Sequence, residues 1–307
     1  MPNNFQIPDL IKICGEHFET RVNQHCRAVG EATRRWIDEH AFLDERTRDA
    51  LPGMQIELLA SLCYPTCDMS QLRTTNDLSS VAFLGRYHTK GVNEQAHQVA
   101  LASVADRLKR AMNERWGNRF QTGLDSLETD LRNVQEPRRN MSEEELLSLK
   151  RTSEIFDLGF TLIEYTEDLE LSDANLQAFP LPELRQKALD AVIWMKDIVA
   201  YNTQQSRNEK DNLIMLLMNE NQITLERAIV LAADRLKQCV QEFVRLSNEN
   251  EGKPMGQDVL RYIQGLRDWI VGWAHWVYET EEYFLKKGED VQAFGWVFLL
   301  PKEDKAD

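Results

Sequence analysis

The sequence predicts an all-α protein built around one hydrophobic core, and three observations support this. Nearly every segment carries apolar residues at three- and four-residue intervals, which is the period of an amphipathic helix. No segment alternates apolar and polar residues for long enough to indicate a sheet. Residues 188–194 and 213–218 are apolar almost all round, as expected for helices at the centre of a bundle. With 307 residues, 42% of them hydrophobic, the chain can bury a sizeable core.

The helical period covers most of the chain and predicts about ten helices. We expect helices at residues 57–63, 78–84, 97–116, 120–134, 144–164, 182–201, 212–218, 225–246 and 257–285. Helix-ending residues predict breaks at Pro52-Gly53, Gly91, Pro137, Phe179-Pro180 with Pro182, and residues 252–254. Because no repeat, low-complexity tract or change of composition interrupts it, the chain is expected to form one domain over residues 1–307. Its tail, residues 302–307, is expected to be frayed.

The charge of the chain restricts its partners. The net charge is −14 and the isoelectric point is near 5.0, which argues against nucleic acid and anionic membrane, since both are polyanions. No run of about 18 apolar residues indicates a membrane span, and the first residues lack the pattern of a signal peptide. We therefore expect a cytoplasmic protein, monomeric or homodimeric, with a small-molecule partner.

Four patches of sequence are more specific than the periodicity. They are Phe5-Gln6-Ile7-Pro8-Asp9-Leu10 with Arg21-Val22-Asn23-Gln24-His25 and Trp36; Leu51-Pro52-Gly53-Met54 with Cys63-Tyr64-Pro65; Tyr201-Asn202 with Gln205-Ser206-Arg207, Asn212, Ile214 and Leu217-Met218; and Trp269, Trp276, Glu279 and Tyr283-Phe284. In this order, across essentially the full length, the patches resemble fungal class I terpene synthases of the sesquiterpene type. The resemblance implies an α-helical bundle with a central apolar pocket that is open at one end. It also implies that residues 1–40 form an N-terminal strap.

The resemblance also implies a chemistry that the residues do not support. Active members of the family hold Mg²⁺ between two acidic motifs and use it to ionise a prenyl diphosphate, because hard cations need oxygen ligands. The position of the aspartate-rich motif is occupied by Arg86, Tyr87, His88, Thr89 and Lys90, none of which is acidic. The nearest acid upstream is Asp77, roughly 13 Å away along a helix axis, which is too far to substitute.

The second motif and the diphosphate contacts differ in the same way. Its three ligand positions, spaced to share one helix face, are Lys196, Ala200 and Gln204. The diphosphate-sensing arginine of the family corresponds to Lys150, and the arginine of the C-terminal Arg-Tyr pair corresponds to Glu282. We therefore expect no metal site and no cofactor, and Mg²⁺ only if the chain is an unusual prenyl diphosphate cyclase.

The basic residues suggest what could replace the metal. In the family's fold Arg86, Lys90, Lys150 and Lys196 would surround the pocket mouth, where they could bind a carboxylate or polarise a carbonyl. We predict Lys150 and Lys196 as catalytic residues. The predicted substrate-binding residues are Phe83, Arg86, Tyr87, His88, Lys90, Tyr201, Trp276 and Tyr283.

The function predicted from these residues is metal-independent cyclisation of a preformed, oxidised terpenoid. An intramolecular Diels–Alder reaction is an example, since it needs only a chosen conformer and a polarised carbonyl. Schiff-base chemistry through a desolvated lysine is a further route. Two alternatives stay open: a non-catalytic terpenoid-binding protein, and the unusual magnesium-dependent cyclase. Taken without the fold, Arg86 and Lys90 would be a solvated helix face, and Trp273, Trp276 and Tyr283 would be core.

Overall fold

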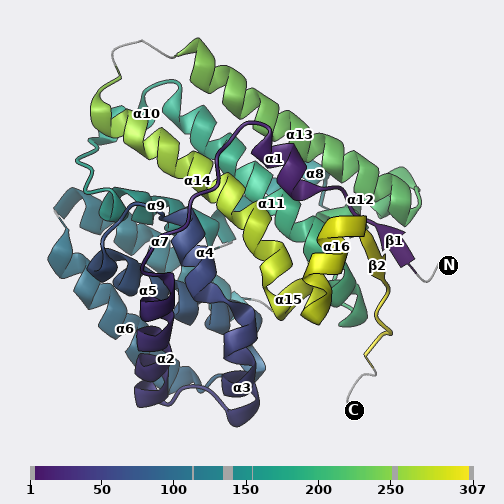
Figure 1. Ribbon diagram of the computed structural model, residues 1–307. Coiled ribbons are helices and arrows are strands. Elements are labelled where there is room, and N and C mark those ends of the chain that lie inside the picture. Colours follow the sequence, from purple (N-terminus) through teal and green to yellow (C-terminus); the bar gives the residue numbers. More distant parts are fainter. Residues whose placement is uncertain (1–3, 113, 134–140, 154, 251–254, 304–307) are drawn as a thin grey trace.

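The computed structural model describes residues 4–112, 114–133, 141–153, 155–250 and 255–303, and these residues form an α-helical bundle with one short sheet (Figure 1). The predicted all-α class is therefore confirmed. The elements are β1 (Asn4–Gln6), α1 (Leu10–Gly15), α2 (Cys26–His40), α3 (Glu45–Met54), α4 (Ile56–Cys63), α5 (Met69–Tyr87), the 3₁₀ turn η1 (Thr89–Gly91), α6 (Glu94–Ala111), α7 (Glu114–Asn133), α8 (Glu143–Ser153), α9 (Phe156–Thr166), α10 (Asp173–Gln177), α11 (Leu181–Ser206), α12 (Leu213–Asn221), α13 (Leu225–Glu249), α14 (Gln257–Glu279), α15 (Glu281–Phe284), the 3₁₀ turn η2 (Leu285–Lys287), α16 (Gly288–Phe294) and β2 (Trp296–Phe298).

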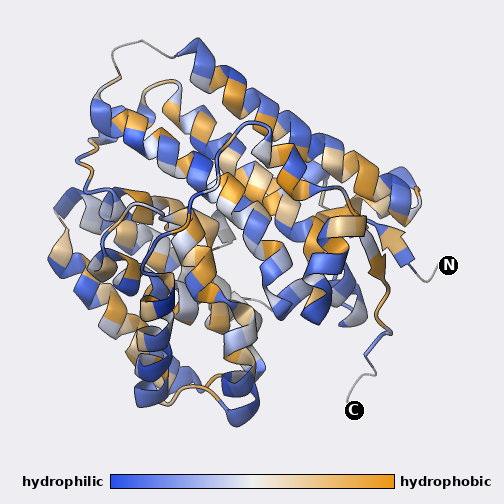
Figure 2. Ribbon diagram, viewed as in Figure 1, coloured by the Kyte–Doolittle hydropathy of each residue, from blue (hydrophilic) through white to orange (hydrophobic). Residues whose placement is uncertain are grey.

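Helix α11 lies at the centre of the bundle. Every residue from 188 to 202 is buried, which agrees with the all-round apolar pattern of its sequence. Helices α13, α14, α12 and α8 pack against it. The outer helix α13 buries only one face, and Figure 2 shows hydrophilic and hydrophobic residues alternating along it. No described helix has an apolar stretch long enough to cross a membrane.

The two ends of the chain meet in a sheet that the periodicity could not predict, because each strand has only three residues. β1 pairs antiparallel with β2, with Phe5 opposite Val297. The segment after β2 then follows the end of α11, where the amide of Asn202 donates to the Phe298 carbonyl and the Glu303 N–H donates to the Ser206 carbonyl. Lys302 and Glu303 thus belong to an ordered segment rather than a frayed tail, and residues 304–307 lie outside the described part.

Several predicted helix boundaries are wrong, for local reasons. α3 continues through Pro52 and Gly53 and ends at Gln55, which adopts a left-handed backbone. The predicted helices at 97–116 and 144–164 each divide into two, at Met112 and before Phe156. The predicted helix at 257–285 divides at Thr280, whose extended backbone ends α14 and whose hydroxyl caps α15. The predicted strap is extended or irregular before Cys26 except for the short helix α1, and the rest of it forms α2; the break at Pro137 lies outside the described residues.

A buried carboxylate joins α2, α5 and α6. Asp77 is fully buried and accepts hydrogen bonds from Thr33 at 2.7 Å, Arg73 at 2.8 Å and Arg107 at 2.7 Å. All three donors lie on helices that pack against one another, so Asp77 fixes their relative positions. Asp77 is thus occupied by these three donors. This agrees with the expectation that it does not substitute for the acids of the aspartate-rich motif.

We expect Asp77→Ala to lower the free energy of unfolding by about 2–4 kcal/mol, because two arginines and a threonine lose a buried acceptor. Chemical denaturation monitored by circular dichroism measures this. Glu249→Ala is the control, since Glu249 pairs with Arg245 on the surface, and it should change stability by less than about 0.5 kcal/mol. A loss as small as that in the Asp77 variant would contradict the role of this network.

Candidate functional site

The two lysines predicted as catalytic lie together around one buried carboxylate. Lys150 on α8 places its Nζ 3.3 Å from Asp197 Oδ2, and Lys196 on α11 places its Nζ 3.3 Å from Asp197 Oδ1. Lys150 also donates to the main-chain carbonyl of Asp211 at 3.1 Å. Both lysines are buried, with 0% and 4% exposure. They therefore form an internal ion cluster, and do not stand as open cations around a mouth as predicted.

Asp197 has a second role that holds the cluster in place. Its Oδ2 accepts the Leu213 N–H at 2.8 Å at the start of α12. Asn212, the N-cap of α12, donates to the main-chain carbonyl of Asp197 and accepts from the Ile214 N–H. A buried carboxylate is stable only when such partners replace the water it has lost. The sequence reasoning missed this role of Asp197, although the residue lies between Lys196 and the rest of the motif.

The remaining positions of the second motif serve the same helix junction. The Gln204 side chain accepts a hydrogen bond from the Asn212 amide at 2.7 Å. Ala200 is buried against the core. The face that carries metal ligands in the family therefore joins α11 to α8 and α12 in this chain.

Residues 86–90, which occupy the position of the aspartate-rich motif, do not belong to one helix. α5 ends at Tyr87, His88 is its C-cap, and Lys90 lies exposed on the 3₁₀ turn η1. The turn is tied to the connection between α2 and α3, because the Asp44 N–H donates to the Gly91 carbonyl and the Asn93 N–H donates to the Phe42 carbonyl. Arg86 thus lies in the last turn of α5, whereas Lys90 lies on the turn after it. The side chains of Arg86, Tyr87 and Thr89 lie outside the described residues.

His88 and Glu282 connect the end of α5 to α15. His88 Nε2 lies 2.8 Å from Glu282 Oε1, and both side chains are mostly buried. Glu282 occupies the position of the family's diphosphate-binding arginine, so a residue that would repel a diphosphate now holds a histidine. The His88 ring also lies 6.0 Å from the ring of Phe83.

Aromatic side chains from four helices meet beside this pair. Phe83, Trp276 and Tyr283, all predicted as pocket wall, are in contact: the Trp276 ring lies 5.8 Å from Phe83 and 6.0 Å from Tyr283. Trp273 and Phe156 extend the cluster, with ring distances of 4.9 Å from Trp276 to Trp273 and 4.8 Å from Trp273 to Phe156. The position of Trp273 in the cluster could be expected from its helical spacing to Trp276 on α14. The position of Phe156 could not, because the sequence shows only that this residue is apolar.

Tyr201 does not belong to this cluster. Its ring packs edge-on against Phe5 of β1 at 5.5 Å, at the junction of α11 with the N-terminal strand. The prediction that Tyr201 shapes the pocket is therefore wrong in this structure. The patch around Tyr201 and Asn202 instead holds the ends of the chain.

The indole of Trp273 is a buried donor without an acceptor in the described part of the chain. Trp273 has no exposed surface, and its Nε1–H makes no hydrogen bond to any described residue. The neighbouring Trp276 differs, because its Nε1–H donates to the carbonyls of Met54 and Gln55. An unsatisfied buried N–H costs about 1–3 kcal/mol, so the Nε1–H of Trp273 is a donor that the described residues leave unused.

A small cavity of about 20 Å³ lies between Phe83, Gly159 and Trp269. This volume corresponds to about one water molecule, and small-molecule sites are usually several hundred Å³. A terpenoid therefore requires side chains around this cavity to move.

Comparison with known proteins agrees with the fold and the patches. Residues 58–242 match the family described as "Terpene synthase family 2, C-terminal metal binding". The chain belongs to this terpene synthase family. It is 26% identical to sesquiterpene synthase Agr1 of Cyclocybe aegerita, over 97% of this chain and 93% of that one, and 25% identical to alpha-muurolene synthase of Coprinopsis cinerea, over 97% and 78%.

Solved structures show the same fold. The crystal structure of a-eudesmol synthase has a TM-score of 0.73 at 17% identity and covers 85% of this chain and 96% of its own. Hedycaryol synthase in complex with HEPES has a TM-score of 0.72 at 15% identity, with 89% and 98% covered. At these identities the likeness concerns the fold alone, and it confirms the class I terpene synthase bundle.

The metal named in the family description does not fit the residues of this terpene synthase relative. Within the described part of the chain, no three His, Cys, Asp or Glu side chains lie close enough together to hold a metal ion. At the second motif, both oxygens of Asp197 already contact ammonium groups or an N–H. A divalent cation there would meet two lysines, so we derive no step through magnesium.

We expect Asp197→Ala to destabilise the protein by about 3–5 kcal/mol, because two buried ammonium groups lose their shared carboxylate. Lys196→Met should have a smaller effect, since Asp197 keeps Lys150 and the Leu213 N–H. Urea denaturation of both variants and of the double variant gives the coupling between the two residues. Equal losses in the two single variants would show that Asp197 is not the centre of the cluster.

Proposed function

We propose that this terpene synthase relative cyclises a preformed, oxygen-bearing terpenoid without magnesium-assisted loss of diphosphate. The observation that carries the proposal is the buried Nε1–H of Trp273, which lacks an acceptor among the described residues and lies within the aromatic cluster. A hydrocarbon chain cannot accept this hydrogen bond, but a carbonyl or hydroxyl oxygen can. The substrate would place its oxygen at Trp273 and its carbon chain against the aromatic rings.

A cycloisomerisation suits such a site. In a Diels–Alder reaction, two C–C bonds form from the π electrons already present, so no atom leaves and no oxidant or metal is consumed. The protein must hold a reactive conformer and polarise a carbonyl, and both effects lower the barrier. Trp273 would donate to the carbonyl, while Phe83 and Trp276 hold the chain.

Lys150 and Lys196 contribute to this proposal as fixed polar groups and not as a source of net charge. The two ammonium groups lie near two carboxylates, Asp197 and Asp211, so the formal charges of the four groups sum to zero. Because Asp197 fixes both lysines at the level of the second motif, their N–H groups would act as hydrogen-bond donors toward the polar end of a substrate. Lys150 and Lys196 would therefore contribute less positive charge at the pocket mouth than the sequence predicted.

A second candidate function is non-catalytic binding of a terpenoid. The observation that favours it is the same neutral, buried cluster: both lysines already contact Asp197, which limits what they can give to a reaction. The two candidates share the aromatic cluster and differ in turnover, so they are separated by product formation.

We expect no release of diphosphate from farnesyl diphosphate, with or without magnesium, because the positions that hold the metal carry Lys196, Ala200 and Gln204. A colorimetric assay for released diphosphate measures this, with sesquiterpene synthase Agr1 as the positive control. Release that requires magnesium and stops on adding EDTA would establish the magnesium-dependent cyclase and overturn the proposal.

With oxidised terpenoids that carry both a conjugated diene and an unsaturated aldehyde, we expect cyclic isomers of unchanged mass whose formation is insensitive to EDTA. Trp273→Phe should lower the rate about tenfold, which corresponds to one hydrogen bond to the reacting oxygen. Trp116→Phe is the control, because Trp116 is equally buried but donates to the Thr161 carbonyl outside this cluster. Mass spectrometry of the products measures both variants. Binding without turnover across the substrate panel would favour the non-catalytic candidate.

A further inference from the structure

A second cleft lies away from the aromatic cluster, between α7, α9, α10 and the first halves of α11 and α14. Its volume is about 650 Å³, within the range of small-molecule sites. It is lined by α11 from Leu181 to Leu189, whereas the second-motif positions begin at Lys196, at least seven residues farther along the same helix. That interval is roughly 10 Å of helix, so the cleft lies beside the second-motif positions and does not include them.

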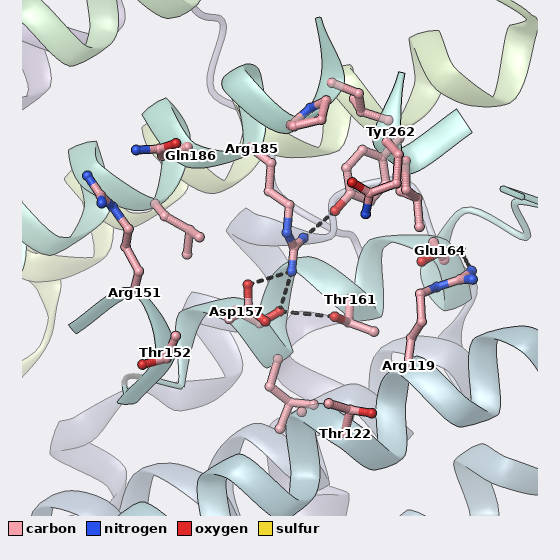
Figure 3. Close-up of a pocket in the computed structure, with 17 residues that line it drawn as sticks. Arg119, Thr122, Arg151, Thr152, Asp157, Thr161, Glu164, Arg185, Gln186 and Tyr262 are labelled. Atoms are coloured by element: carbon pink, nitrogen blue, oxygen red, sulfur yellow. Dashed lines mark hydrogen bonds and ion pairs between the residues drawn. The ribbon is translucent and has the colours of Figure 1, made fainter. Parts of the chain in front are cut away.

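Three arginines reach the cleft from three helices (Figure 3): Arg119 from α7, Arg151 from α8 and Arg185 from α11. Arg185 donates to Asp157 at 2.6 Å and to the hydroxyl of Tyr262. Burial raises the pKa of Tyr262 to about 12, so this hydroxyl stays neutral. The three guanidinium groups are thus held in fixed positions, in a chain whose net charge is strongly negative.

Arg119 and Arg151 are partnered in the same asymmetric way. Each has one buried carboxylate: Glu164 for Arg119, with 3% exposure of its side chain, and Asp190 for Arg151, with 5%. Each also has one exposed carboxylate: Asp173 at 2.8 Å from Arg119, with 78% exposure. The exposed partner of Arg151 is Glu144 at 2.9 Å, with 74% exposure.

The difference in burial decides which partner a ligand can replace. Burial raises the pKa of Asp190 against the opposing effect of Arg151, so this inner carboxylate depends on its arginine. An exposed pair contributes only about 0–1 kcal/mol, because water and salt compete with it. The outer carboxylates can therefore exchange for a ligand carboxylate at little cost. Arg119 offers a further donor, because its Nε is buried and has no hydrogen-bond partner among the described residues.

The rest of the cleft is suited to an apolar chain. Leu158, Leu176, Leu181 and Leu189 line it, and the exposed side chains of Thr152, Gln177 and Gln186 stand at its edge. Leu158 also lines the small cavity beside Phe83, so the cleft and the bundle interior share this wall. An apolar body against the leucines and an anionic end at the arginines would satisfy both kinds of lining.

We propose that this cleft is a binding site for an amphipathic carboxylate, a medium-length apolar molecule with one carboxylate end, which pairs with Arg119 or Arg151 in place of Asp173 or Glu144. Lys150 and Arg151 are consecutive in α8, so a ligand at Arg151 lies directly beside the Lys150 cluster. The inference does not depend on the proposed cyclisation.

Titration calorimetry with dodecanoate, below the concentration at which it forms micelles, tests the site. We expect dodecanoate to bind about tenfold or more tightly than dodecanol, which has the same chain without the charge. Gln186→Trp places a large side chain at the edge of the cleft and should weaken dodecanoate binding about tenfold or more. Gln238→Trp, an equally exposed position on α13 away from the cleft, should leave it unchanged.

A gain of affinity gives the sharper test. Replacing both exposed carboxylates, Glu144→Gln with Asp173→Asn, removes the competitors of the ligand and should tighten dodecanoate binding about three- to tenfold, with no change for dodecanol. Because both side chains are exposed, this variant is expected to fold even if Gln186→Trp does not. Absence of dodecanoate binding to the wild type, equal affinity for dodecanol, or no gain in the double variant would each overturn the proposal.

Discussion

The buried carboxylate of Asp197 is the interaction on which the functional end of the molecule depends. It contacts ammonium groups from α8 and α11 and the Leu213 N–H at the start of α12, and thereby fixes three helices at one point. A fully buried charge is stable only if its partners are complete, so the identities of its neighbours are coupled. Lys150 and Lys196 are best understood as a pair that shares this acid, with Asp211 as a second carboxylate beside Lys150.

This coupling links the residues at the second-motif positions to one another. If Lys196 became a carboxylate again, it would lie beside Asp197 without an added cation, and two acids in a dry site repel each other. The amide of Gln204 is likewise committed to Asn212, which caps α12. A metal-binding residue at position 196 or 204 would therefore disturb these contacts.

Much of the fold could be predicted from the sequence, because amphipathic period and all-round apolar segments follow directly from burial. The limits were local: α3 runs through Pro52-Gly53 and α14 ends at Thr280, since capping and packing outweighed the residue signals. At the site, the sequence predicted roles for Lys150, Lys196 and the aromatic residues Phe83, Trp276 and Tyr283, and the structure places the lysines around Asp197 and the three rings in one cluster. It could not show that Asp197 neutralises the lysines, or that Tyr201 packs on Phe5, because those contacts join residues far apart in the chain or depend on side-chain direction.

Helix α8 places two basic residues in two different environments. Lys150 turns to the buried acid Asp197, and the next residue, Arg151, turns to Asp190 and the open cleft. Asp190 and Asp197 lie on the same helix, α11, so both contacts fix α8 against the same partner. A rigid helix cannot move at Arg151 without also moving Lys150. A displacement of α8 at Arg151 would therefore also displace Lys150, the preceding residue of the same helix.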